Sequence, residues 1–164
     1  MKRNRLTRGA LLTAAALTIF LVEMMIPPIV PIPGVKLGLA NIITLVAMML
    51  IGPVDTLLIL LARILLGGMF SGQIMSILYS FSGGILCYLT MLLLRKHIAL
   101  SQIWAMSIVG AIAHNIGQIA MAILVTRTWE LILYLPVLMV SGILTGLFTG
   151  LAAQAAAVKL KGKL

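Results

Sequence analysis

Three hydrogen-bonding side chains interrupt an apolar stretch in the second half of the sequence. The stretch is GAIAHNIGQIAMAI, residues 110–123, and the three are His114, Asn115 and Gln118. Residues three or four positions apart lie on the same side of a helix, so these side chains share one sector. This sector is expected either to hold helices together by hydrogen bonds or to line a small-molecule site. We favour the lining, because a histidine and two amides offer more donors and acceptors than packing needs.

Two charged residues also fall within apolar runs, and both could converge on the same cavity. Glu23 lies late in the first run and Arg63 lies past the middle of the third. A single buried charge without its counterpart would be expensive. We therefore expect Glu23 and Arg63 to form a structural ion pair.

Four more residues are candidates for the substrate site: Lys36, Asn41, Tyr79 and Ser82. The first two flank the start of the second apolar run, and the other two lie in the outer half of the fourth. Tyr79, like Trp129 and Tyr134, equally fits an aromatic anchor at the membrane surface.

The chain that carries these residues has the composition of an integral membrane protein. Of its 164 residues, 62% are hydrophobic and only 9% are charged, against roughly a quarter charged in globular proteins. Apolar runs of about 17–25 residues, the length a helix needs to cross a bilayer, fill the sequence. This pattern predicts an all-α polytopic fold. The single cysteine, Cys87, lies in such a run and has no partner for a disulfide or metal site.

Proline and glycine divide the chain into six expected transmembrane helices within one membrane domain, 1–164. The approximate bounds are 9–26, 37–51, 54–70, 73–94, 102–125 and 130–158. The segment between the first two spans contains Pro31, Pro33 and Gly34 and is expected to be an extended loop.

The net charge of +9 comes from residues beside the spans, which indicates a lipid bilayer and no nucleic acid as the partner. With both termini in the cytoplasm, the inner side collects nine basic residues and the outer side only Lys36 and Arg127. The positive-inside rule thus predicts an N-in, C-in orientation in a bacterial cytoplasmic membrane. The two outer basic residues slightly favour an anionic substrate.

The first span carries a pair of small residues, Ala10 and Ala14, on one face near its cytoplasmic end. Such pairs let another helix approach closely. The partner could be a helix of this chain or a helix of another protein.

Three stretches resemble the Gx transporter family, whose members are often labelled heptaprenyl diphosphate synthase component I. They are GALLTAAALTIFLVEMMIP, PIPGVKLGLANIITLVAMMLIGP and LARILLGGMFSG, and the resemblance extends from about residue 8 to residue 158. That family is similar to the S components of energy-coupling factor (ECF) transporters, which import vitamins and other micronutrients.

This resemblance implies a six-helix S-component fold that holds a small-molecule substrate near its outer face. It also implies that Ala10 and Ala14 match the motif that docks on a transmembrane coupling subunit, which works with the ATPases of an ECF module. In this view His114, Asn115 and Gln118 line or support the substrate pocket.

The label as a synthase component can be tested by asking whether the sequence contains the carboxylate clusters that such a synthase needs. Condensation of isoprenyl diphosphates needs carboxylate clusters that hold Mg²⁺, but the three acidic residues, Glu23, Asp55 and Glu130, lie far apart in the sequence. A phosphate-binding GxxxxGK[ST] loop is also missing from the sequence. We therefore expect no enzyme activity and no cofactor. Two roles stay open: capture of substrate for an importer, or a non-catalytic membrane partner of an isoprenoid or redox enzyme.

Overall fold

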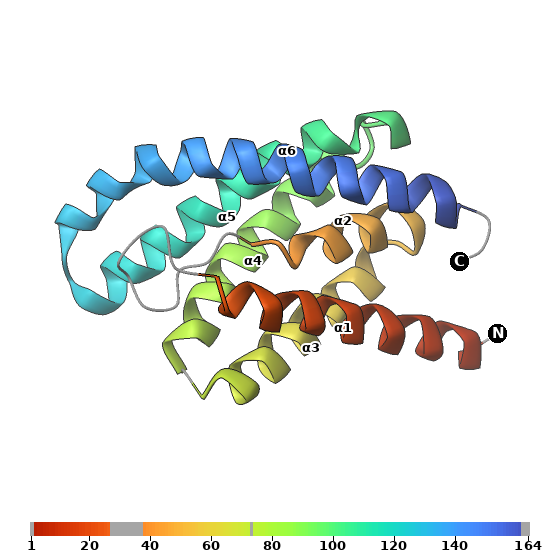
Figure 1. Ribbon diagram of the computed structural model, residues 1–164, viewed down its shortest axis with the longest axis horizontal. Coiled ribbons are helices and arrows are strands. Elements are labelled where there is room, and N and C mark those ends of the chain that lie inside the picture. The colour runs from red at the N-terminus through yellow and green to blue at the C-terminus, as the bar shows by residue number, and fades with distance from the viewer. Residues whose placement is uncertain (1, 27–37, 73, 162–164) are drawn as a thin grey trace.

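The computed structural model describes residues 2–26, 38–72 and 74–161, and in these ranges the protein is an all-α bundle, as the sequence predicts (Figure 1). The helices are α1 (Lys2–Met24), α2 (Asn41–Leu50), α3 (Pro53–Ser71), α4 (Ile74–Leu94), α5 (Ile103–Thr126) and α6 (Leu135–Leu160). Two short 3-10 helices, η1 (Leu100–Gln102) and η2 (Trp129–Tyr134), precede α5 and α6. Within the described residues, five segments are long and apolar enough to cross a membrane, so this is a multi-pass membrane protein.

The second helix is shorter than the sequence indicates. The hydrophobic pattern predicts a span over 37–51, whereas α2 has 10 residues and begins at Asn41. At 1.5 Å per residue it covers about half of the hydrocarbon thickness. The reason is local, because Gly38 has a φ of +80° and donates its N–H to Glu23 Oε1, which holds the chain outside helical geometry.

The first and last spans also differ from their expected bounds. α1 begins at Lys2 instead of about residue 9, since lysine and arginine are good helix formers and extend the helix beyond its apolar part. The last span begins as the 3-10 helix η2, and α6 starts at Leu135 with Pro136 in its first turn. Proline is tolerated there because its missing N–H would have no helical partner.

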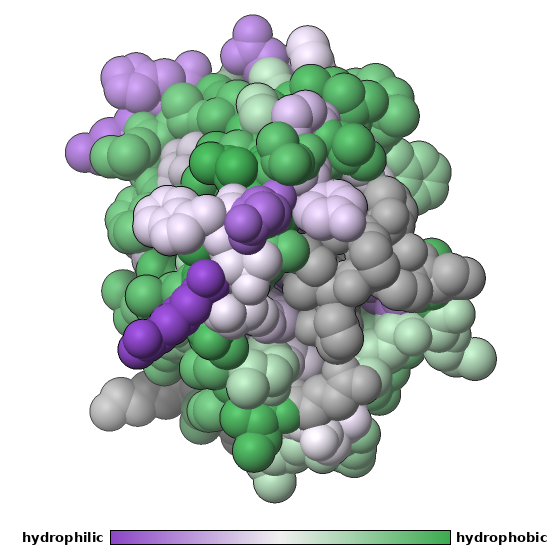
Figure 2. Space-filling model, turned by 90° about the vertical axis from the view of Figure 1, so that its left-hand side faces the viewer, coloured by the Kyte–Doolittle hydropathy of each residue, from purple (hydrophilic) through white to green (hydrophobic). Residues whose placement is uncertain are grey.

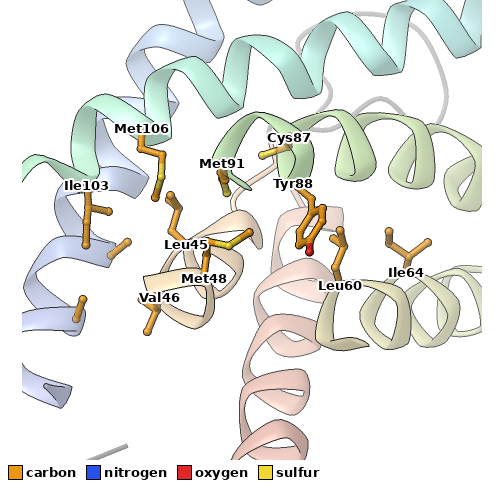
Figure 3. Packing of buried hydrophobic residues seen from close by; sticks show 12 residues of the cluster. Leu45, Val46, Met48, Leu60, Ile64, Cys87, Tyr88, Met91, Ile103 and Met106 are labelled. Atoms are coloured by element: carbon orange, nitrogen blue, oxygen red, sulfur yellow. The ribbon is translucent and has the colours of Figure 1, made fainter. Parts of the chain in front are cut away.

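α2 lies at the centre of one half of the bundle, where it contacts α1, α3, α4 and α6. Its side chains form the middle of the larger apolar core, with α3, α4, α5 and α6 supplying the rest (Figure 3). Among the residues of this core are Leu45, Met48, Leu60, Met91 and Met106. A second, smaller apolar cluster joins α4, α5 and α6 and consists of Tyr79, Ile119, Ala122 and Leu138.

The two ends of the bundle differ in charge. α1 begins and α6 ends at the same end of the molecule, which also holds the connection between α4 and α5 (Figure 1). That connection carries Arg95 and Lys96. The opposite end shows only a few hydrophilic side chains among hydrophobic ones (Figure 2). By the positive-inside rule, the end with the termini is expected to face the cytoplasm.

Cysteine labelling checks this orientation. A cysteine at Thr128, next to exposed Arg127 and Trp129, should react with a membrane-impermeant maleimide in intact cells, and a cysteine at Lys161 should react only after the cells are opened. The native Cys87 is 1% exposed and provides a low background. Labelling of the Lys161 variant in intact cells would reverse the assigned topology.

Candidate functional site

Buried polar side chains form a group inside the bundle, named the polar layer here. Its members come from four helices and are all at most 6% exposed: Glu23, Asn41, Arg63, His114 and Gln118. Such groups are costly inside a membrane protein, so a concentration of them marks a functional site or a strong structural need.

Glu23 ties the end of α1 to the start of α2. Its Oε1 accepts the backbone N–H of Gly38. A Cβ on Gly38 would lie 2.9 Å from Asn41 Nδ2 and 3.2 Å from the ring atom Cδ2 of His114. The turn before α2 therefore lies directly against the imidazole of α5, and its positive φ at Gly38 favours glycine there.

His114 also lies against α4. A Cβ on Gly83 would lie 2.9 Å from both His114 Nδ1 and Gln118 Cγ. The imidazole is thus enclosed between the turn before α2 on one side and the middle of α4 on the other. Both contacts depend on residues without a side chain, and this leaves the polar edge of α5 close to two neighbouring backbones.

Arg63 is the one permanent charge of the layer and is 3% exposed. It interacts electrostatically with Glu23 and His114. Its Cζ lies 5.9 Å from the centroid of the Phe20 ring, a cation–π distance. Within the described part of the chain, its Nε and Nη2 atoms have no hydrogen-bond partner.

Asn115 and Ser82 use their polar atoms to join helices. Asn115 Nδ2 donates to the carbonyl of Leu138 at 2.6 Å, and Ser82 Oγ donates to the carbonyl of Gly117 at 2.7 Å. Asn115 therefore points toward α6, whereas its neighbour His114 points toward α2 and α4. The sequence allows two roles for Asn115, a hydrogen bond between helices or the lining of a site. The observed bond is of the first kind.

Of two other candidates, one packs in the smaller apolar cluster and one lies outside the described residues. Tyr79 is 3% exposed and packs in the smaller apolar cluster, so its interpretation as an anchor at the membrane surface is wrong. Trp129, at 73% exposed, keeps that interpretation. Lys36 lies outside the described residues, as does the proline-rich segment that precedes it.

Three residues of the site, Phe20, Gly38 and Gly83, are not indicated by the sequence pattern. Phe20 lies three residues before Glu23 and is 2% exposed, so helical spacing could have placed it on the same inward face. The roles of the two glycines depend on contacts between distant segments, which no local pattern reveals.

The small-residue face of α1 points away from the bundle. Ala10 and Ala14 are exposed, whereas Ala16, Phe20 and Glu23 on the other side are buried against α2 and α3. The alternative in which these two alanines pack against a helix of this chain is therefore wrong. The face is available to lipid or to another protein.

The side chains that could bind a metal ion are the histidines, cysteines and acidic residues. Across residues 2–26, 38–72 and 74–161, histidine, cysteine and acidic residues form no group of three that could hold a metal ion. The arrangement is suited to binding by hydrogen bonds and charge, with one guanidinium, one carboxylate, one imidazole and two amides.

The fold and this layer define a polytopic α-helical membrane protein with a buried polar centre. The family model described as heptaprenyl diphosphate synthase component I matches residues 12–156, and the chain belongs to that family. No curated protein and no solved structure gives a significant match.

Proposed function

We propose that this protein is the substrate-binding subunit of an ECF-type importer of a micronutrient or cofactor precursor. It captures a small molecule from the outer face of the bacterial cytoplasmic membrane and docks on a coupling subunit and its ATPases. It catalyses no reaction itself.

The observation that carries this proposal is the polar layer. Hydrogen bonds such as those from Asn115 and Ser82 are enough to join helices. Arg63, by contrast, is buried with donors that no described residue satisfies. An unsatisfied buried donor costs about 1–3 kcal/mol, and more when it is charged, so a bundle that needed only packing would gain if apolar side chains replaced Arg63 and Glu23 together. A binding site explains why it is present.

The outward face of α1 supports the second half of the proposal. Close helix approach in a membrane depends on small residues, and Ala10 and Ala14 present them to the outside. They lie about two and three turns beyond the start of α1 at Lys2, and Glu23 lies at the other end of that helix. Docking and capture would therefore use different parts of the protein.

The family description favours a second function. In this alternative the protein is a non-catalytic membrane partner of an isoprenoid synthase, as the words component I suggest. The same alanine face would then receive that enzyme, and the polar layer would have no soluble small molecule to bind.

Replacing both Ala10 and Ala14 with tryptophan tests the docking role. Both residues are exposed, so the protein should fold and keep its melting temperature within a few degrees. The bulky rings should block close approach of a partner helix, and copurification of the coupling subunit and ATPases should fall at least tenfold.

The matched control is Ala155→Trp. Ala155 is an exposed alanine of α6, near the end of the molecule where α1 begins. It should copurify as the unchanged protein does. Equal recovery of the partners with the Ala10 and Ala14 variant would remove this face from the docking site. Recovery of a prenyl synthase subunit in place of ATPases would favour the alternative function.

A further inference from the structure

Arg63 has a free edge that is shaped to bind one kind of chemical group. Its Nε and Nη2 atoms lie on the same side of the planar guanidinium, and neither has a partner within the described residues. Two parallel N–H donors in this arrangement match the two oxygens of a carboxylate. The side chain is 3% exposed, so bulk water does not satisfy this edge as it would on a surface.

The surroundings fix the orientation of the guanidinium. Phe20 lies over the group at a cation–π distance, and a Cβ on Gly67 of α3 would lie 2.8 Å from Phe20 Cδ1. Gly67 is one helical turn beyond Arg63, so the absence of a side chain there lets the ring lie close to α3. An aromatic ring on its face and the carboxylate of Glu23 nearby hold the cation while its free edge stays available.

A second unsatisfied group lies in the same layer. The side-chain oxygen Oδ1 of Asn41 is buried and also has no partner in the described residues. Asn41 and His114 both lie against Gly38, and Arg63 interacts electrostatically with His114. The site therefore offers a pair of donors to an anion and one acceptor to an N–H or O–H group.

We infer that Arg63 anchors the carboxylate of a small monocarboxylate substrate that also carries a hydrogen-bond donor for Asn41. This inference rests on the proposed function. A phosphate group fits less well, because its charge of about −1.5 to −2 and its three acceptor oxygens need more donors than one guanidinium edge supplies. Glu23 adds a further negative charge beside the same cation, which disfavours a dianion.

Arg63→Lys is the sharpest test, because it keeps the positive charge beside Glu23 but removes the planar pair of donors. The purified protein is incubated with a desalted small-molecule extract of the cells that produce it, washed and denatured. Released compounds are measured by mass spectrometry before and after coupling of carboxylates to an amine with a carbodiimide.

The expected result is one compound enriched on the unchanged protein whose mass rises by that of one amine less one water, because each amide that forms releases one water. Its retention should fall at least about tenfold in Arg63→Lys, the loss typical of a removed charge-assisted hydrogen-bond pair. Arg95→Lys, a matched change in the connection between α4 and α5, should retain it fully. Melting temperatures without extract should show that all three proteins are folded.

The other outcomes separate this inference from the proposed function. A compound that is retained equally by the unchanged protein and Arg63→Lys would overturn the role of Arg63 and leave substrate binding intact. A retained compound that contains a phosphate, or that does not react in the coupling, would overturn the carboxylate assignment. If the unchanged protein enriches no compound, the proposed function fails and this inference fails with it.

Discussion

Gly150→Leu should prevent α5 and α6 from packing closely and lower the free energy of unfolding by about 3 kcal/mol, the upper end of the usual cost of overpacking. A Cβ at this position would lie 2.5 Å from the backbone Cα of Trp104 and 2.6 Å from Ser107 Cβ. The obstacle is mainly backbone, so no flexible side chain can move aside. The two helices would have to separate along the packed length that also holds the Ser107–Thr149 hydrogen bond of 3.0 Å. Unfolding by SDS, followed by circular dichroism, measures the change.

Gly9→Leu is the matched control for this prediction. A Cβ on Gly9 meets no heavy atom within 4 Å, so the same substitution on α1 should leave stability within about 1 kcal/mol. If Gly150→Leu unfolds no more easily than Gly9→Leu, the close packing of α5 on α6 is wrong.

Arg63→Met should destabilise the bundle by about 3–5 kcal/mol, the usual cost of leaving one partner of a buried ion pair uncompensated. Glu23 is 4% exposed, so removal of the guanidinium leaves its buried carboxylate with the N–H of Gly38 but without the positive charge of Arg63. The same unfolding measurement applies.

The double substitution Glu23→Gln with Arg63→Met tests whether the cost arises from the charge. It removes both charges and keeps an amide that can still accept the N–H of Gly38, so it should recover most of the lost stability. It should nevertheless fail to retain a small molecule. Additive losses in the double variant would mean that Glu23 and Arg63 do not form a pair.

The inward direction of α5 was largely predictable from the sequence. The spacing of His114 and Gln118 places both on one face, and the structure buries them at 3% and 1% exposed. The spacing could not show that Asn115, about 100° further around the helix, meets a different neighbour. Its partner is a carbonyl of α6, and such a contact depends on how two helices pack.

The start of α2 shows why other parts were not predictable. The residues Leu39 and Ala40 suit a helix as well as those that follow, so a local pattern extends the helix through them. The hydrogen bond from the Gly38 N–H to Glu23 instead makes the helix begin later, at Asn41. This bond joins residues 15 positions apart in the sequence. The sequence also could not predict that Ala10 and Ala14 are exposed, because a small-residue pair fits a partner helix of this chain or of another protein.

The most direct test of the proposed function is a native mass spectrum of the unchanged protein, released from detergent micelles directly after purification. Capture of a substrate predicts a second species that exceeds the 17.6 kDa chain by the mass of one small molecule, with about one bound per protein. This species should disappear in the double variant at Glu23 and Arg63. A spectrum that contains only the bare chain and its lipid adducts, from protein purified with and without added cell extract, would contradict a substrate-binding role.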